Sequence, residues 1–552
     1  MTATKAEKNL EWFDKFNLSA DYSKLQKNPV AYFCAEFALI DHMPSYAGGL
    51  GILAGDYILE AADRVFPIVG IGLYYKKGQN GQTKDGEPNG TKFGLKLLTT
   101  NSERLLIPIP LADKNIFAQV WCWQKENNCV YFLDTNISEN TEQDRLITEQ
   151  LYVEDREFRL KQELVLGIGG VRLLKRLSIE PSVYHLNEGH SAFLIIELIG
   201  EQIKNGLAFS DAIIKVKEKV VFTNHTLVLE GQEMFAFDSL TKATKKLCAE
   251  LSIEIDNILK MGVATGNDKL FSMTSFALNG AKITNAVSKI HGEKARELWS
   301  KYLITHITNG IYIPRWDKIK NENILIEHQK NEEKVLELIR QTHGENWKKE
   351  ALLIGWSRRF VPYKRPLALL DDVVKLKKIL EYFKGKVHIV YSAPLDNDDA
   401  KNNEFLKKLY ELMDGELKGY LTFIPHYRIE VAEKLTAGCD IWLNTPIVGR
   451  EACGTSGMKA ALNGTLSVST NDGWINEIPL NDYGWLIDDN NITDNLLEKL
   501  CKEIMPEYED YVTNKNDSKW VKFMKKSREL IIDQFSTTRM LHEYIEKLYL
   551  KK

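Results

Sequence analysis

The 552-residue sequence has no long apolar run, no paired-cysteine motif and no excess of basic residues. Its longest apolar stretches fall far short of the roughly 20 residues that a membrane-spanning helix needs. The first residues, MTATKAEKNLEWFDKF, lack the apolar centre of a signal peptide. A formal net charge of -4 provides no basic field for nucleic acid. We therefore expect a cytoplasmic protein that binds neither a membrane nor nucleic acid.

The cysteines also lack the spacing of a disulfide framework. There are seven of them, an odd number, and no two form a C-x-x-C pair. A scattered set of this kind in a large chain is typical of reduced thiols. We expect buried, unpaired side chains that act as small hydrophobic groups. They are Cys34, Cys122, Cys129, Cys248, Cys439, Cys453 and Cys501.

What the sequence does contain is a repeated alternation of short apolar runs with helical segments. After residue 350 the runs are ALLIGWS, HIVYSAPL, YLTFIPHY, DIWLNTP and TLSVST, with helical sequence between them. This alternation predicts a parallel sheet covered by helices on both faces. The first half alternates in a similar way, and a charged helical stretch near 315–350 separates the two halves. We therefore predict an α/β protein with two doubly wound domains that face each other across a cleft.

The predicted N-terminal domain spans residues 1–310 and the C-terminal domain spans 311–525. Residues 526–552 are expected to form a helix that packs back on the N-terminal domain. In such folds, ligands bind beyond the C-terminal ends of the strands. A long helix is expected over 157–177, and we interpret the sequence GIGG within it as close helix packing rather than a nucleotide-binding motif.

Four cationic residues lie in the segment RRFVPYKR, directly after the apolar run ALLIGWS. They are Arg358, Arg359, Lys364 and Arg365. Guanidinium and ammonium groups just past a buried strand form a strong site for an oxyanion. A solvated basic face is the alternative for this segment alone, but its place after a strand favours a binding site.

The segment EACGTSGMKAALN places small residues before a helix-forming run. A glycine-rich loop that opens a helix presents free N–H groups to a phosphate. Lys459, in the first turn of that helix, can bind the phosphate or bond to a carbonyl cofactor. A nucleotide P-loop is excluded because G-x-x-x-x-G-K-[ST] is not matched. An ordinary helix start with a surface lysine is the alternative.

Two further patterns are weaker by themselves. YAGGLGILAGD places Gly48 and Gly49 before an apolar helix, where the backbone can approach a ligand, although a tight turn also explains them. HLNEGH and FTNHT place histidines, among them His190 and His225, at predicted strand ends. A structural role is the commoner one for such residues. We expect no metal site, because no third cluster has ligand spacing.

Taken together and in this order, these segments resemble the glycogen and α-glucan phosphorylases of glycosyltransferase family 35. The similar segments span residues 31–477, and EACGTSGMK together with RRFVPYKR and TNG is the most specific combination. The resemblance implies two Rossmann-like domains of the GT-B type with the active site between them. It also implies retaining phosphorolysis of terminal α-1,4-glucosidic bonds in an α-glucan or maltodextrin. Inorganic phosphate would be the second substrate, α-glucose 1-phosphate the product and pyridoxal 5'-phosphate the cofactor.

The resemblance also implies roles for individual residues. Lys459 corresponds to the lysine that holds pyridoxal phosphate, and Arg359 and Lys364 correspond to ligands of the substrate phosphate. The other cofactor contacts that it implies are Arg358, Thr455, Tyr427, Arg428, Trp316, Gly48 and Gly49. The residues expected to grip the transferred glucosyl unit are Asn309, His225, Glu451, Cys453 and Gly454. His225 would also help to stabilise developing charge, and His190 with Glu188 corresponds to a pair behind the site.

The mechanism implied by the resemblance uses inorganic phosphate as the acid that protonates the glycosidic oxygen, with the cofactor phosphate as a proton relay. The same phosphate then captures the oxocarbenium-like sugar from the same face. Two other functions fit part of the pattern. A retaining nucleotide-sugar glycosyltransferase, such as a glycogen-synthase relative, shares the fold but needs no lysine like Lys459. A glucan-binding relative without catalysis would have no need of Lys459, Arg359, Lys364 and His225 together.

The sequence also departs from the family pattern at three places. SAPLDNDDAK stands where the family usually has Ala-Gly-Lys, so one lysine is lost and acids are gained, which is expected to weaken phosphate binding. FTNHTLVLEG lacks a proline often found after this histidine. The chain before Val30 is short, so we expect no phosphorylation-dependent regulation. The resemblance leaves a homodimer open, since family members are often dimers.

Overall fold

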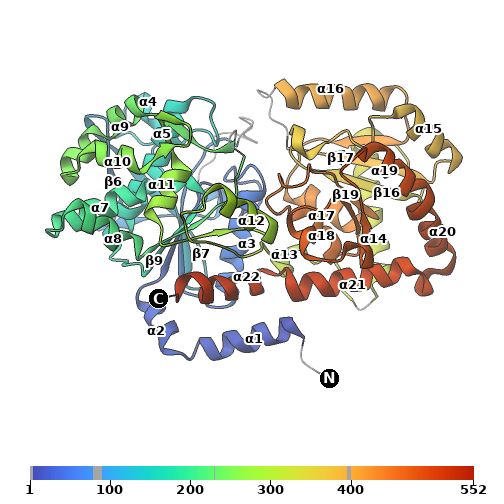
Figure 1. Ribbon diagram of the computed structural model, residues 1–552, viewed down its shortest axis with the longest axis horizontal. Helices are drawn as coiled ribbons and strands as arrows, with labels where there is room; N and C mark the ends of the chain where they lie inside the picture. Colours follow the sequence, from blue (N-terminus) through green and yellow to red (C-terminus); the bar gives the residue numbers. More distant parts are fainter. Residues whose placement is uncertain (1–3, 79–89, 229–230, 322, 395–399, 552) are drawn as a thin grey trace. The chain divides into compact units, whose positions relative to one another are not determined.

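The computed structural model describes residues 4–78, 90–228, 231–321, 323–394 and 400–551. The chain forms two compact units. The one that we term the N-terminal unit consists of Glu7–Val287, Gly292–Ile307 and Met540–Lys552. The other, the C-terminal unit, consists of Met1–Ala6, Ser288–His291 and Thr308–Arg539. Each is a mixed α/β structure whose sheet is largely parallel and is surrounded by helices (Figure 1).

The sheet of the C-terminal unit has the strand order β18-β17-β16-β19-β20-β21, and every neighbouring pair is parallel. Its strands are β16 (Leu352–Ser357), β17 (Val387–Ser392), β18 (Leu421–Ile424), β19 (Ile441–Asn444), β20 (Leu466–Ser469) and β21 (Gly484–Leu486). Counted along the chain this order is 3-2-1-4-5-6, in which the direction of winding reverses between β16 and β19. Ligands of doubly wound sheets bind at that reversal, beyond the strand ends.

Apolar side chains on both faces explain why the runs after residue 350 form strands. Successive side chains of a strand point to opposite faces of its sheet. Along β16, Ile354 and Trp356 belong to one buried hydrophobic cluster, whereas Leu353 belongs to another. Helices therefore cover both faces, as the continuous apolar runs predicted.

The charged stretch near 315–350 contains α14 (Ile324–His343). Asn323 caps its start by accepting hydrogen bonds from the N–H groups of Leu325 and Ile326, and Gly344, with φ 71°, ends it. The other longer helices of this unit are α15 (Val373–Tyr382), α16 (Ala400–Asp414), α17 (Ile429–Gly438), α18 (Ser456–Leu462), α19 (Ile492–Lys499), α20 (Met505–Asn514) and α21 (Lys519–Gln534).

The sheet of the N-terminal unit repeats the same winding pattern. Its strand order is β15-β14-β10-β9-β1-β2-β8-β7-β3, with β6 also paired to β7. The segment from β15 to β8 is parallel, and β7 is antiparallel to β8, β3 and β6. The winding direction reverses between β1 and β9. The strands are β1 (Val30–Phe33), β2 (Ile68–Leu73), β3 (Lys96–Leu97), β6 (Ile107–Leu111), β7 (Lys114–Lys125), β8 (Asn128–Asp134), β9 (Val183–Asn187), β10 (Val220–Thr223), β14 (Ile283–Ala286) and β15 (Ile304–His306).

Two small antiparallel sheets and a set of helices complete the described part of this unit. The small sheets contain β4 (Thr99–Thr100) with β5 (Glu103–Arg104), and β11 (Met234–Ala236), β12 (Val263–Ala264) and β13 (Asn267–Ser272). The helices are α2 (Ala20–Lys27), α3 (Gly49–Asp63), α4 (Glu142–Arg145), α5 (Arg156–Leu164), α6 (Gly170–Arg176), α7 (Leu194–Lys204), α8 (Phe209–Lys217), α9 (Phe237–Leu251), α10 (Ile255–Met261) and α11 (Met273–Gly280). Three others, α1 (Lys5–Phe16), α12 (Lys289–Leu298) and α22 (Thr537–Tyr544), include residues assigned to both units.

The long helix expected over 157–177 is interrupted. A π-helical segment, Val165–Gly169, joins α5 to α6. The glycines in it pack as predicted, since a Cβ added to Gly167 would lie 2.5 Å from the backbone nitrogen of Leu194. A Cβ added to Gly170 would lie 2.4 Å from the ring of Phe33. Close packing therefore explains these glycines, and they do not form a nucleotide-binding motif.

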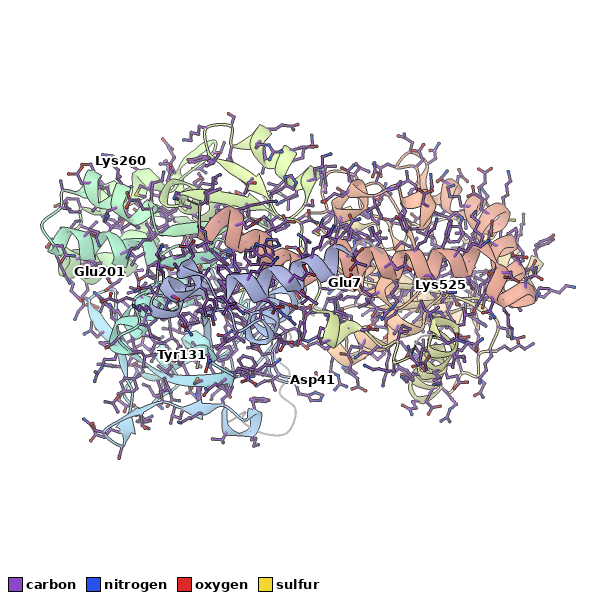
Figure 2. The ribbon with its side chains drawn as sticks, turned by 90° about the horizontal axis from the view of Figure 1, so that it is seen from below. Glu7, Asp41, Tyr131, Glu201, Lys260 and Lys525 are labelled. Carbon is purple, nitrogen blue, oxygen red and sulfur yellow. The ribbon has the colours of Figure 1, made fainter. Side chains whose placement is uncertain are left out.

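The last residues of the chain pack into the core of the N-terminal unit. The hydroxyl of Tyr549 lies 2.7 Å from Nδ1 of His185 on β9 and 2.7 Å from the hydroxyl of Tyr57 on α3. Charged side chains instead cover the outside, such as the exposed Lys260 of α10 and Lys525 of α21 (Figure 2). All seven cysteines are free, as predicted, and five of them are buried. In the described ranges, we find no helix with the length and apolar character that a membrane crossing requires.

Candidate functional site

The arginine-rich turn follows the C-terminal end of β16, at the point where the winding of the sheet reverses. The side chain of Arg358 is buried, whereas that of Arg359 is exposed. Lys364 ends a short 3₁₀ helix, Pro362–Lys364. Arg365 turns away from these cations: its guanidinium donates to the carbonyl oxygens of Thr445 (2.8 Å) and Pro446 (2.7 Å). Three of the four cations can therefore face a ligand, and Arg365 instead anchors the turn to the segment after β19.

Glu451 forms ion pairs with two of these cations. Its Oε2 accepts from Nη1 of Arg358 at 2.9 Å and from Nζ of Lys364 at 2.6 Å. Burial acts to raise the pKa of Glu451, but the charges of Lys364 and Arg358 outweigh it and hold that pKa at about 2. Burial lowers the pKa of Lys364 to about 8, against the opposing pull of Glu451. Both pKa values are lowered, which favours the charged form of Glu451 but the neutral form of Lys364. Two cations stabilise the carboxylate, whereas burial and two guanidinium groups disfavour the charge of the ammonium.

The loop that carries Glu451 continues directly into α18. Gly454 has φ 79°, and a Cβ placed there would lie 2.7 Å from Nη2 of Arg358, so only glycine fits the turn. Asp472 holds the loop from the other side, because its Oδ2 accepts from the N–H of Glu451 at 2.9 Å. The backbone N–H of Trp474 donates to the carbonyl oxygen of Cys453 at 3.2 Å. Residues 472–474 therefore support the loop structurally.

Lys459 lies on α18 and its side chain is 4% exposed. Its Nζ lies 3.9 Å from the centroid of the Trp316 ring. The side-chain amide of Asn463 donates to the carbonyl oxygens of Lys459 and Trp316, both at 2.8 Å, and so joins the two segments. Lys459 is therefore buried, which rules out the alternative of an ordinary surface lysine.

Four other predicted residues lie near this loop or at a strand end of the same sheet. Thr455 precedes α18, and Tyr427 and Arg428 follow β18. Burial raises the pKa of Tyr427 to about 12, against the opposing charge of Arg358. Asn309 is buried, and no hydrogen-bond partner is present for its Oδ1. An unsatisfied buried acceptor beside a polar loop fits a place where a ligand hydroxyl binds.

Cys453 of the same loop is a buried thiol whose pKa is raised above its usual range by burial. It is therefore a neutral group. Such a thiol contributes shape and weak hydrogen bonds to a site and does not act as a nucleophile.

The remaining predicted residues lie in the N-terminal unit, in the segments that follow β1, β9 and β10. Gly48 and Gly49 begin α3, and a Cβ added to either would meet no atom within 4 Å. In the same segment, a Cβ on Gly51 would lie 2.5 Å from Cβ of Tyr46, and one on Gly55 would lie 2.2 Å from the carbonyl of Ala38. Packing thus explains Gly51 and Gly55 but leaves Gly48 and Gly49 with open space where a ligand can approach the backbone.

His225 follows β10 and is held at two points by the loop after β9. Its Nε2 lies 2.7 Å from Oδ1 of Asn187, and its backbone N–H donates to Oε2 of Glu188 at 2.9 Å. Because an amide oxygen only accepts, Nε2 carries the proton. Glu188 has φ 71° and ψ 168°, a backbone conformation that costs about 1–3 kcal/mol and is concentrated at functional sites. Asn187 is a positioning residue that sequence reasoning missed.

Glu188 and His190 are neighbours in sequence but face different partners. Burial raises the pKa of Glu188 to about 7, although the N–H groups of His225 and Gly189 oppose the shift. His190 instead lines a small cavity with Glu163 and Tyr152. Of the departures from the family pattern, residues 395–399 of SAPLDNDDAK and residues 229–230 of FTNHTLVLEG lie outside the described residues.

The fit of a pyridoxal group to this site can be judged from the residues that are present. Such a group needs a lysine amine shielded from water, a flat wall for its ring and cations for its phosphate. Lys459 and Trp316 provide the first two, and the adjacent Arg358 provides charge. The donor set therefore fits pyridoxal phosphate.

The doubly wound sheets, with a buried lysine on α18 and an arginine-rich turn after β16, are features of an α/β protein that binds ligands at its strand ends. A model of the carbohydrate phosphorylase family matches residues 411–482, which include the loop from Glu451 to Lys459. The chain is 34% identical to a maltodextrin phosphorylase of Thermococcus litoralis, over 98% of this chain and 72% of that protein. It is 29% identical to a glycogen phosphorylase of Aquifex aeolicus, over 97% of this chain and 88% of that protein. An uncharacterised protein of Methanocaldococcus jannaschii is 31% identical, over 94% of this chain and 99% of its own length. The chain belongs to the carbohydrate phosphorylase family.

Proposed function

We propose that this enzyme is an α-glucan phosphorylase that cleaves terminal α-1,4-glucosidic bonds of glucans or maltodextrins with inorganic phosphate. The products are α-glucose 1-phosphate and a shortened glucan. The observation that carries the proposal is the buried Lys459, placed one short loop from Glu451 and the two cations that Glu451 holds. Relatives named maltodextrin phosphorylase and glycogen phosphorylase, aligned over nearly the whole chain, support it.

We assign pyridoxal 5'-phosphate to Lys459, with Trp316, Thr455, Tyr427, Arg428, Arg358, Gly48 and Gly49 as its other contacts. When bound, this group supplies a phosphate whose second pKa, near 6 in phosphoesters, suits proton exchange at neutral pH. Burial of Lys459 excludes water from its amine. Arg358, fixed by Glu451, offsets the repulsion between crowded phosphates.

Arg359 and Lys364 are assigned to the substrate phosphate. An exposed guanidinium can form a two-pronged contact with a phosphate that enters from solvent, and the ammonium adds a point charge. The bound phosphate donates a proton to the glycosidic oxygen as the bond from that oxygen to the anomeric carbon breaks. A phosphate oxygen then bonds to the anomeric carbon from the same face, so the α configuration is retained. Both cations keep the phosphate on that face throughout.

The transferred sugar is assigned to Asn309, His225, Glu451, Cys453 and Gly454. Asn309 presents an unsatisfied amide oxygen that can accept a bond from a sugar hydroxyl. His225 is held in one orientation by Asn187 and Glu188, so its contact with the sugar requires no reordering. Glu451 has a low pKa and remains an acceptor at neutral pH.

Several broader expectations remain proposals alongside this one. They are the domain division 1–310, 311–525 and 526–552, the GT-B arrangement of the two Rossmann-like domains, a cytoplasmic location and a homodimer. The similar winding of the parallel strands in each unit supports the two Rossmann-like folds. Absence of control by phosphorylation is tested by treating the purified enzyme with kinases and assaying it.

The test of the function is an assay of the purified protein with maltodextrins of several lengths. Release of glucose 1-phosphate that requires inorganic phosphate, by a protein with a pyridoxal chromophore, supports the proposal. A colourless protein that consumes a nucleotide sugar would instead be a glycosyltransferase like glycogen synthase. A colourless protein that binds glucan without turnover would be a binding protein.

Replacing Arg359 by alanine is expected to lower kcat/KM for phosphate roughly 100-fold, because a charge-assisted contact to the substrate is lost. The pyridoxal absorbance should not change, since Arg359 is not assigned to the cofactor. Steady-state kinetics at varied phosphate, with absorbance spectra, measure both effects. Arg340→Ala, which removes a surface arginine paired with Glu337, is the matched control. Wild-type kinetics in the Arg359 variant would remove this residue from the phosphate site.

The apparent KM for phosphate is expected to rise above pH 8. Because burial lowers the pKa of Lys364 to about 8, this side chain loses its charge as the pH passes that value. The KM should then increase by up to about tenfold per pH unit. In Lys364→Arg the guanidinium stays charged, so the KM should be higher at pH 7 but flat to pH 9.5. The same slope in both proteins would assign the titration to another group.

A further inference from the structure

A small cavity in the N-terminal unit contains a group of ionisable side chains that the proposed reaction does not use. Its volume is about 10 Å³, which is near the size needed for one atom-sized ligand. Glu163 on α5 lines it together with His190, from the 3₁₀ turn Gly189–Ser191, and Arg159. Glu233, just before β11, lies beside them. The cluster thus joins three segments that are far apart in the sequence.

Two of these side chains are buried without hydrogen-bond partners. Glu163 is 4% exposed, and neither of its carboxylate oxygens has a partner. Nδ1 of His190, which lines the same cavity, also has none. A buried carboxylate with both oxygens unsatisfied is unfavourable unless a proton, a hydrogen-bond donor or a cation binds to it. Three orphaned ligand atoms therefore converge on one small space.

Most of the neighbouring charged side chains already have partners. Glu233 forms ion pairs with Arg156 and Arg159, of which Arg156 is exposed. Glu36 accepts a hydrogen bond from Tyr152, which also lines the cavity. Glu163 is the carboxylate that lines the cavity without a hydrogen-bond partner among the described residues, so its oxygens are available to a cation.

We propose that Glu163, His190 and Glu233 bind one divalent transition-metal ion of the Zn²⁺ type. One ligand atom from each residue lies within 4.8 Å of the other two. Ligands about 2.0–2.2 Å from a shared zinc are separated by about 3–3.5 Å, so small side-chain rotations bring the three atoms to an ion. Imidazole with carboxylate oxygens suits zinc, iron or manganese better than calcium or magnesium.

His190 offers Nδ1, a ring nitrogen without a hydrogen-bond partner, to the same space as the unpartnered carboxylate of Glu163. An imidazole binds a metal in its neutral form. A proton on Glu163 is the competing way to satisfy these atoms, because a carboxylic O–H can donate to Nδ1 of His190. Metal titration distinguishes the two, since a protonated pair would bind no Zn²⁺ at one equivalent.

The metal would tie α5 and the segment before β11 to the turn that contains His190. Glu188, in the same turn, accepts from the backbone of His225. The ion would therefore act as a structural clamp for the loops at these strand ends, in addition to the proposed phosphorolysis. Sequence reasoning rejected a metal at HLNEGH for want of a third cluster, and the fold supplies Glu163 and Glu233 from elsewhere in the chain.

The test is metal binding by the full-length protein after dialysis against a chelator. Isothermal titration with Zn²⁺, and the visible spectrum with Co²⁺, should show one site per chain. Glu163→Gln should weaken that site roughly 100-fold, and His190→Asn should do the same. Glu157→Gln, which removes an exposed carboxylate from the same helix, should leave it unchanged. Zn²⁺ should also raise the Tm of the wild type but not that of Glu163→Gln.

A wild-type protein that binds no Zn²⁺ or Co²⁺ at one equivalent would overturn the proposal, and so would equal affinity in Glu163→Gln. Circular dichroism confirms that each variant is folded before titration. The outcome is independent of the proposed phosphorolysis, because binding and Tm are measured without substrate. A protein that binds no metal but releases glucose 1-phosphate would reject the clamp and leave the phosphorylase assignment in place.

Discussion

Lys459→Ala is expected to abolish phosphorolysis, with a loss of at least about 10⁴-fold in kcat, and to yield a colourless protein. The reason is that alanine has no amine with which to hold the carbonyl cofactor, and the enzyme then lacks the cofactor phosphate. Lys459→Arg should fail in the same way, because a guanidinium keeps the positive charge but does not bond to a carbonyl. Activity assays and absorbance spectra of the two variants measure this.

The controls separate loss of cofactor from loss of fold. Lys434→Ala on α17 removes a lysine of the same unit that pairs with Glu430, and it should retain colour and activity. In the wild type, borohydride reduction and peptide mass spectrometry should place the pyridoxyl group on the peptide with Lys459. A folded, coloured and active Lys459→Ala protein would refute the assignment.

Much of the C-terminal sheet could be predicted, because its strands are buried on both faces. A continuous apolar run such as that of β16 needs helices on both faces of the sheet. Leu353 and Ile354 are both buried, each in a different hydrophobic cluster. The positions of Arg358 and Lys364 followed from the same logic, since a chain that leaves a parallel strand emerges at the ligand-binding end. Local sequence was sufficient for these features.

Features that depend on pairing across the fold could not be predicted. Arg365 lies in the same basic segment as Arg359, but only the loop after β19 decides that it bonds to the carbonyls of Thr445 and Pro446. The support of His225 by Asn187 likewise depends on β9 lying beside β10. No spacing along the chain indicates these contacts.

The glycines illustrate the same limit in a single segment. YAGGLGILAGD contains closely spaced glycines of similar appearance. Gly51 and Gly55 are required by contacts with Tyr46 and Ala38, whereas Gly48 and Gly49 border open space. A sequence shows that a side chain is absent, but only the packing shows whether another part of the protein fills the place. Gly48 and Gly49 are for that reason the stronger ligand-binding candidates.

Glu451→Gln is expected to lower the free energy of unfolding by about 3 kcal/mol at pH 7. The amide keeps the shape of the side chain but leaves Lys364 and Arg358 buried without a counter-charge, and breaking one side of a buried pair costs about 3–5 kcal/mol. Part of that cost is avoided because Lys364, whose pKa is already low, can lose its proton. Urea unfolding followed by circular dichroism measures the difference. Glu430→Gln, which breaks the surface pair with Lys434, should cost less than about 1 kcal/mol.

The pH dependence of that difference identifies its electrostatic origin. The folded-state pKa of Glu451, about 2, is lower than its ordinary value of 4.5. As the pH falls, the unfolded chain therefore takes up the proton first, and the stabilisation is complete above about pH 4.5 and declines toward pH 2. The gap between wild type and Glu451→Gln should accordingly shrink below about pH 4.5. A gap that stays the same down to pH 3.5 would mean that the carboxylate contributes hydrogen bonding rather than charge, and that the cations need no anion to remain buried.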